Sequence, residues 1–134
     1  MLDNFVLGPA IAMGLVLSLI EIYFVSVDEA GMRWLSHALH AVPTMMIFTA
    51  VAMNVGPVLS LLGLSLEGGW VYFGIRALVG IVAMVKVKVA ASITGKGGVG
   101  ESNMHVFIIG VLIAASPYIW EFALEDVIGQ YFSF

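Results

Sequence analysis

The chain contains no cysteine and very little charge. Among its 134 residues, none is Cys and 10% are Asp, Glu, Lys or Arg. Disulfides, iron–sulfur clusters and thiolate metal sites are therefore excluded. A soluble globular domain usually carries about 25% charged residues. So few charges would not cover a soluble protein of this size, whereas a lipid-facing surface needs none.

Positive charge is the scarcer sign. Five Lys and Arg stand against nine Asp and Glu, for a net charge of -4, and no basic cluster stands out. Nucleic acid is therefore not an expected partner. The first apolar run lacks a positive leader and is long for a signal peptide, so we expect it to be retained.

Long apolar runs are what the chain has in abundance. A membrane-spanning helix needs about 20 mostly apolar residues. Four stretches qualify, at about 5–27, 41–64, 69–91 and 104–122. We predict an all-α integral membrane protein, a single domain over 1–134 with four transmembrane helices in an up-down bundle. Pro117 should kink the last helix.

The connections are short. Residues 28–40 place Met32, Leu35, Ala38 and Leu39 on one side, which predicts a short interfacial helix between helices 1 and 2. Residues 95–102, Gly-Lys-Gly-Gly-Val-Gly-Glu-Ser, resemble the phosphate-binding loop of the ParA/MinD ATPases. That family has a second lysine where this chain has Glu101, and it sets the loop between a strand and a helix. Here the flanks are membrane segments, so we expect no nucleotide.

Lysine and arginine are enriched in short cytoplasmic loops. Arg33 lies in the first connection, and Lys86, Lys88 and Lys96 lie around the third. With four spans these connections share one side. We therefore place both termini on the non-cytoplasmic side of the membrane.

Ionisable side chains inside a span are costly and normally face the bundle interior or reach toward the membrane surface. At 1.5 Å per residue, Glu21 and Lys86 lie at about the same depth, and Arg76 and Glu121 lie near the opposite boundary. We predict these two charge pairs and expect them to hold the bundle together. A proton or ion path is the alternative, but Asn54 and two nearby hydroxyls offer few polar groups for it.

Small residues at four-residue spacing favour close helix packing. Three helices carry such residues: Ala10, Gly14 and Ser18 on the first, Ala52, Gly56 and Ser60 on the second, and Gly110 and Ala114 on the fourth. Packing of the first two helices against each other is the expected use. Contact with another subunit is the alternative.

The three histidines all fall near the predicted inner surface. His37 and His40 share one helix face, and His105 begins the fourth helix, with Glu21 and Asp28 nearby. Imidazole and carboxylate together suit Zn, Fe, Cu or Ni, and a haem would need histidines on separate helices. No strong metal signature is present. We expect hydrogen-bonded interfacial histidines and no cofactor, with a metal or haem site as the alternative.

No nucleophile with a supporting base stands out, so an enzyme is not expected. The leading hypothesis is a small accessory or structural subunit of a larger membrane complex or homo-oligomer. Its partners would be the lipid bilayer and other membrane subunits or copies of itself. An oligomeric ion or proton channel or small transporter is the second hypothesis. An electron-transfer subunit that binds metal or haem is the third.

Overall fold

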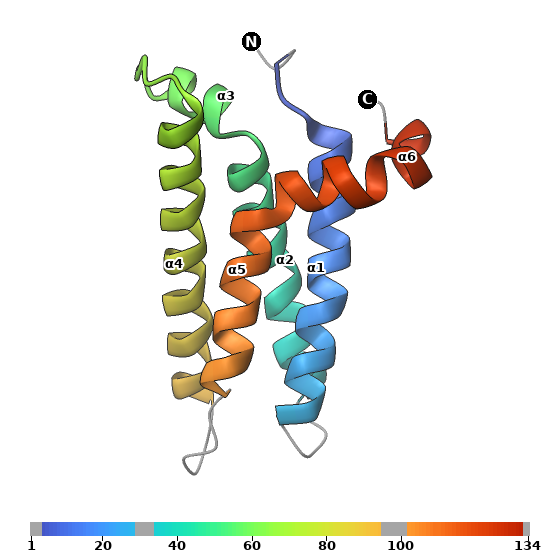
Figure 1. Cartoon of the computed structure of the whole chain (residues 1–134). Helices are drawn as coiled ribbons and strands as arrows, with labels where there is room; N and C mark the ends of the chain where they lie inside the picture. The colour runs from blue at the N-terminus through green and yellow to red at the C-terminus, as the bar shows by residue number, and fades with distance from the viewer. Residues whose placement is uncertain (1–3, 29–33, 95–101, 133–134) are drawn as a thin grey trace.

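The computed structural model describes residues 4–28, 34–94 and 102–132, and these ranges are helical without a strand. The elements are α1 Leu7–Asp28, α2 Trp34–Met53, α3 Val55–Leu61, α4 Gly69–Thr94, α5 Asn103–Ile119, the π-helical η1 Trp120–Leu124, α6 Glu125–Ile128 and the 3₁₀ turn η2 Gly129–Tyr131. The four long helices run alternately up and down, and α6 lies at the end where α1 begins (Figure 1). The all-helical prediction is confirmed.

Three helical segments are long and apolar enough to cross a membrane: α1, most of α4, and the segment from α5 to η2. The α2–α3 pair would make a fourth, although it is bent by 88°. The prediction of one continuous helix over 41–64 is therefore wrong. Pro57 lacks an N–H, and its ring clashes with the carbonyl four residues earlier, which belongs to Met53. The α2 helix ends at that residue.

The separate interfacial helix predicted within 28–40 is also corrected. From Trp34 to His40 the chain forms the first turns of α2 itself. No glycine or proline interrupts the sequence between Trp34 and Val42, so the helix has no local reason to break there. Residues 29–33 lie outside the described part of the chain.

The last helix changes direction near Pro117. The α5 helix continues into the π-helical turn η1, and the following segment extends across the end of the bundle (Figure 1). Trp120, Leu124 and Ile128 belong to the packed apolar cluster, and Trp120 meets Phe132 edge-on. Helix therefore continues to Tyr131, beyond the end predicted at 122.

The bundle consists of two antiparallel helix pairs, α1 with α2 and α4 with α5. Glycine permits the closest approaches. A Cβ on Gly80 would lie 2.5 Å from the Gly110 carbonyl oxygen, and one on Gly14 would lie 2.6 Å from Met46 Sδ. Any larger residue at Gly80 would push the α4 and α5 backbones apart.

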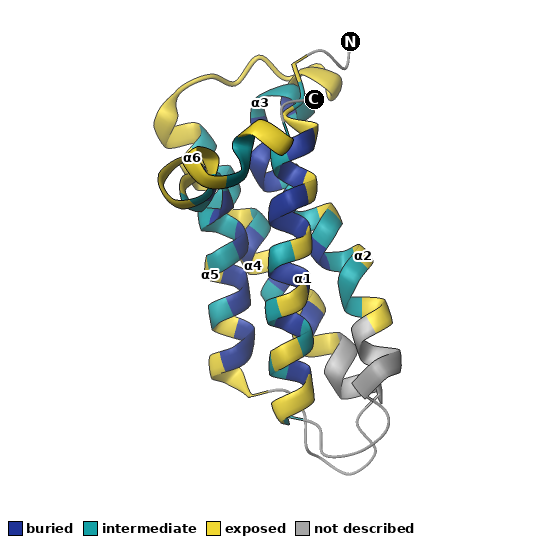
Figure 2. Cartoon of the chain, turned by 90° about the vertical axis from the view of Figure 1, so that its right-hand side faces the viewer, coloured by how far each residue is buried: buried dark blue, intermediate teal, exposed yellow. Residues whose placement is uncertain are grey.

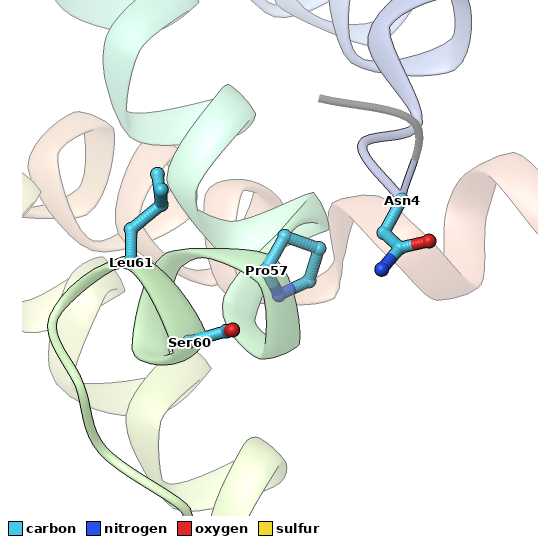
Figure 3. Close-up of a pocket in the computed structure, with 4 residues that line it drawn as sticks. All are labelled: Asn4, Pro57, Ser60 and Leu61. Carbon is cyan, nitrogen blue, oxygen red and sulfur yellow. The ribbon is translucent and has the colours of Figure 1, made fainter. Parts of the chain in front are cut away.

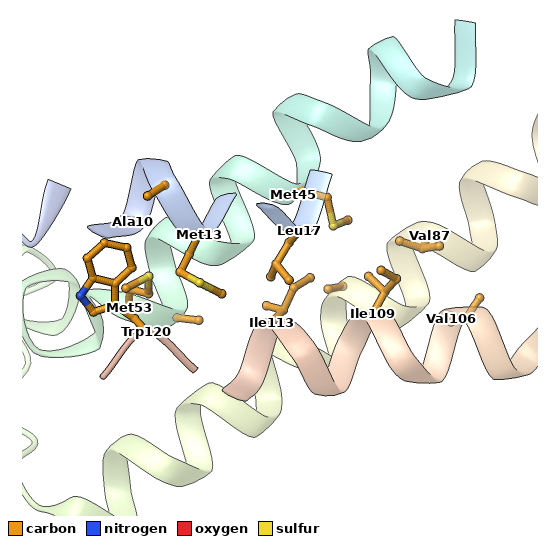
Figure 4. Packing of buried hydrophobic residues seen from close by; sticks show 13 residues of the cluster. Ala10, Met13, Leu17, Met45, Met53, Val87, Val106, Ile109, Ile113 and Trp120 are labelled. Carbon is orange, nitrogen blue, oxygen red and sulfur yellow. The ribbon is translucent and has the colours of Figure 1, made fainter. Parts of the chain in front are cut away.

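Apolar side chains fill the centre of the bundle. Met13, Leu17, Met45, Ile109 and Ile113 are buried there, as Figure 4 shows from close by. The outward faces also carry many exposed apolar residues, including Leu19, Ile47, Leu78 and Phe107. Buried positions face inward and exposed positions face outward on each helix (Figure 2). An apolar exterior of this kind is compatible with a multi-pass membrane protein.

Candidate functional site

Glu21, Asp28 and His105 form a cluster, the His105 cluster, at the end of the bundle where α5 begins. His105 Nε2 lies 2.7 Å from Glu21 Oε2, and His105 Nδ1 lies 3.0 Å from Asp28 Oδ2. The His105 and Glu21 side chains are 1% and 3% exposed, whereas that of Asp28 is 20% exposed. The cluster therefore extends from the bundle interior toward its surface.

Helical spacing on α1 explains how two carboxylates reach one imidazole. Glu21, Phe24 and Asp28 stand at i, i+3 and i+7, which places them on one helix face. The Phe24 ring stacks on the His105 ring, with centroids 4.8 Å apart and planes at 21°. Each carboxylate then approaches a different ring nitrogen, and the Phe24 ring covers one face of the imidazole.

The start of α5 fixes the other side of the contact. Ser102 caps this helix, because its hydroxyl accepts a hydrogen bond from the His105 backbone N–H at 3.1 Å. The Ser102 backbone N–H donates to Asp28 Oδ2 at 3.0 Å. A carboxylate at a helix N-terminus is favourable because it meets unpaired N–H groups and the positive end of the helix dipole. Asp28 thus binds both the backbone and the first histidine of α5.

The geometry of the His105 cluster limits where its hydrogens can be. A neutral imidazole has one N–H donor and one acceptor nitrogen, whereas the imidazolium donates from both. Both His105 nitrogens face carboxylate oxygens at hydrogen-bond distance. Each of the two contacts needs a hydrogen between its atoms, and an imidazolium between two carboxylates supplies both. That arrangement also pairs the buried charge of Glu21, which would be costly alone.

A second polar group, centred on Asn54, lies at the opposite end of the bundle. The buried Asn54 side chain accepts from the Val6 backbone N–H through Oδ1 at 2.7 Å, and donates through Nδ2 to the Ala50 carbonyl at 2.9 Å. Asn54 stands at the bend between α2 and α3. It therefore joins this bend to the start of α1.

Arg76 on α4 stabilises the same bend from the other side. Its Nε donates to the Ala52 carbonyl at 3.2 Å, and its Nη1 donates to the Tyr118 hydroxyl at 3.1 Å. The guanidinium carbon also lies 5.3 Å from the Tyr118 ring centroid, within the range of a cation–π contact. The α2 helix ends at Met53, one residue beyond Ala52, and a cation is favoured beside the carbonyls at a helix C-terminus.

Neither of the two predicted charge pairs is among the ion pairs of the described residues. Glu21 pairs with His105, while Lys86 is exposed on α4. Arg76 reaches Ala52 and Tyr118, while Glu121 is exposed on η1. Within the described ranges, neither predicted pair forms an ion pair. Depth along a helix locates a charge between the membrane surfaces, but it does not say which face of the bundle the charge occupies.

The small residues predicted to pack helices lie in three different settings. Ala10, Gly14 and Ser18 are buried on α1, with Gly14 against Met46 of α2. Ala52 is buried on α2, but Gly56 and Ser60 belong to α3 beyond the bend, and Ser60 is exposed. Gly110 and Ala114 face Gly80, which brings α5 against α4.

The predicted metal ligands are not brought together in the described part of the chain. His105 faces two carboxylates on opposite ring nitrogens, and His40 is exposed on α2. The His37 side chain and residues 95–101, which include most of the phosphate-loop resemblance, lie outside the described residues. Among described side chains, no three His, Asp or Glu converge on a possible metal position.

A small pocket lies beside α3. Asn4, Pro57, Ser60 and Leu61 line it, and its volume is about 120 Å³ (Figure 3). Ligand pockets usually measure about 300–1,000 Å³. This hollow is therefore too small for an ordinary substrate.

Comparisons with protein-family models, curated proteins and solved structures give no match to this chain. The function of the chain must therefore be inferred from its own residues.

Proposed function

We propose that the chain is a structural subunit of a membrane complex, crosses the bilayer four times, and packs against another subunit through the outer face of α4. The observation that carries this proposal is a stripe of exposed residues on α4. Val71, Gly74, Leu78, Ile81 and Val85 are all exposed, and successive members are three and four residues apart. This alternation aligns side chains along one helix face and is the spacing used by helices that pack nearly parallel.

Gly74 would allow a neighbouring helix to approach the α4 backbone closely within the exposed stripe. A Cβ at this position would meet nothing within 4 Å, so the α4 backbone is open to the outside there. By contrast, Gly80 on the same helix is buried against Gly110. Small residues allow a neighbouring membrane helix to come close enough for backbone contacts. The two glycines would thus serve different neighbours, α5 inside the chain and a partner helix outside.

The charge of Lys86 favours another protein as the partner over a second copy of this chain. Lys86 is exposed next to Val85, near the His105 end of the apolar stretch Gly69–Val89. A cation at this depth is costly unless it reaches the membrane surface or meets a carboxylate. Among the described residues, the carboxylates of this chain at that end, Glu21 and Asp28, already bind His105. A partner helix with an acidic residue at this depth would complement Lys86.

The bundle interior favours a structural role over the passage of protons or ions through a single chain. The buried layer of Met13, Leu17, Met45, Ile109 and Ile113 lies between the His105 cluster and Asn54. Ser18 and Ser116 in this region donate to carbonyls of their own helices, those of Gly14 and Ile113. A proton or ion path needs polar groups or water in sequence, and the buried polar side chains in this region are Ser18, Thr49 and Ser116, between apolar ones.

Native mass measurement tests the proposal. Extraction in lipid nanodiscs should give particles that contain the 14.3 kDa chain and at least one other membrane protein. Gly74→Leu should reduce the amount of co-extracted partner, because the larger side chain keeps a partner helix away from the α4 backbone. Lys86→Leu should also reduce it, because it removes the charge that a partner carboxylate would meet. Leu19→Ala, on the exposed face of α1, should leave the association unchanged. A lone monomer under these conditions would contradict the proposal.

Ion or proton passage by an oligomer is the second candidate, and the buried Glu21–His105 contact favours it. Because apolar side chains fill the interior of one chain, passage would have to run between chains. Purified protein in liposomes would then show flux that Glu21→Gln abolishes. Absence of flux at every pH and membrane potential tried would argue against this candidate.

A further inference from the structure

We propose that the His105 cluster is a proton-binding site, in which His105 Nδ1 exchanges one proton with water through Asp28 while Glu21 stays bound to Nε2. The proposal goes beyond a structural role and does not depend on a partner subunit. It follows from three features of the cluster: the position of the carboxylates, their unequal burial and the second bond of Asp28.

The first feature is that the two contacts are not equivalent. The Glu21–His105 contact is 2.7 Å long between side chains that are 3% and 1% exposed. The Asp28–His105 contact is 3.0 Å long, and the Asp28 side chain is 20% exposed. Water therefore reaches the Asp28 side of the ring. The buried Glu21 has His105 as its bonded partner, so it gains most from keeping the hydrogen on Nε2.

The second feature is that Asp28 keeps another partner when the proton leaves. Its Oδ2 also accepts from the Ser102 backbone N–H at the start of α5. In the loaded state, the imidazolium donates from Nε2 to the Glu21 carboxylate and from Nδ1 to the Asp28 carboxylate. On release, the Nδ1–H bond breaks and the proton passes by way of Asp28 to water. The product is a neutral imidazole with hydrogen on Nε2, and no electrons are transferred.

Proton release also changes the contact between helices. The unloaded Nδ1 presents a lone pair to the Asp28 oxygen at a distance of 3.0 Å, so this contact becomes repulsive. Asp28 would then retain the backbone of α5 but lose its side-chain bond. The loaded site carries a net charge of -1, and the unloaded site carries -2. Occupancy by the proton therefore tightens α1 against α5 at this end of the bundle.

Within residues 4–28, 34–94 and 102–132, the helices around His105 carry several charged and titratable groups. Glu21 and Asp28 are the charged groups that α1 presents to the ring. On α4, Lys88 donates from Nζ to Asn103 Oδ1 at 2.7 Å, two residues from His105 along the chain. His40 is the described histidine of α2, and it is exposed. Phe24 covers one face of the ring without charge.

Nitrogen NMR of histidine-labelled protein in lipid nanodiscs tests the proposal directly. His105 should show both nitrogens protonated at low pH and only Nε2 protonated at high pH, with signals assigned by His105→Gln. Asp28→Asn should weaken proton binding about tenfold or more, because it removes the carboxylate beside Nδ1. Glu125→Gln, which changes an exposed carboxylate on α6, should leave the titration of His105 unchanged.

The outcome that would overturn the proposal is equally specific. A His105 signal that keeps one protonation state throughout the titration would exclude an exchangeable proton. A neutral form with hydrogen on Nδ1 would exclude the assigned direction of exchange. The Asp28→Asn variant keeps the buried Glu21–His105 contact, so the NMR test needs no substitution at Glu21.

Discussion

The Arg76 guanidinium donates to the Ala52 carbonyl 3.2 Å away, one residue before the end of α2. This contact joins α4 to a point where the neighbouring helix loses its own hydrogen bonds. In a membrane, such carbonyls need a hydrogen-bond donor from the protein, because no water is present to donate instead. The bend between α2 and α3 is therefore supported by a residue of α4.

Arg76→Leu should lower the free energy of unfolding by about 1–3 kcal/mol, because it leaves a carbonyl at the bend without its donor. Tyr118→Phe should cost less, since it removes one acceptor but keeps the ring and the Ala52 contact. Denaturant titration in detergent micelles measures both variants. Equal losses would mean that Tyr118, and not the α2 carbonyl, is the important partner of Arg76.

Asn54→Ala should destabilise the chain by about 1–3 kcal/mol, because the Val6 N–H loses a buried acceptor. Fraying should begin at the first turn of α1, where hydrogen exchange would become faster than in the wild type. Gln130→Ala, which removes an exposed amide on η2, serves as the matched control. Unchanged exchange at the start of α1 would show that Asn54 does not hold it.

Gly80→Ala should destabilise the packing of α4 on α5 by about 1–3 kcal/mol, because its Cβ would lie 2.5 Å from the Gly110 carbonyl oxygen. The control is Gly69→Ala at the start of the same helix, where a Cβ meets nothing within 4 Å. Thermal unfolding followed by circular dichroism compares the two variants. Equal stability would contradict the close approach of the two backbones.

The proposed four crossings, with the basic connections on the inner side, would place the two ends of the bundle on opposite sides of the membrane. Single cysteines can be introduced without interference, because the chain has none. Asn4→Cys and Gln130→Cys should react with a membrane-impermeant maleimide from outside intact cells. Asn103→Cys should react only after the membrane is opened. The reverse pattern would invert the orientation, and labelling of Asn4 and Gln130 from opposite sides would contradict four crossings.

The start of two long helices could be predicted from apolar run length, since α1 and α4 begin within a few residues of the expected positions. The bend at Asn54 was missed because hydropathy continues across it. Pro57 was the available signal, as its missing N–H and its ring act on the carbonyl of Met53. The proline therefore predicts the break, whereas the hydropathy averaged over the segment does not.

The candidate site was only partly predictable. Glu21, Asp28 and His105 could be assigned to one end of the bundle, but not to each other, because pairing depends on helix rotation and on which helices are neighbours. The i, i+3, i+7 spacing of Glu21, Phe24 and Asp28 was the signal for a shared face. Lys86 matched Glu21 in depth and yet lies exposed on α4. Sequence position predicts the depth of a residue in a membrane bundle. The residues that it contacts depend on helix rotation and on which helices are neighbours.

Site-specific crosslinking on α4 is the sharpest test of packing against a partner subunit. A photo-crosslinking amino acid in place of Leu78, in the exposed α4 stripe, should form an adduct with another membrane protein when native membranes are illuminated. The same amino acid in place of Leu19, on the exposed face of α1, should give lipid adducts alone. Lipid adducts alone at both positions would contradict the account.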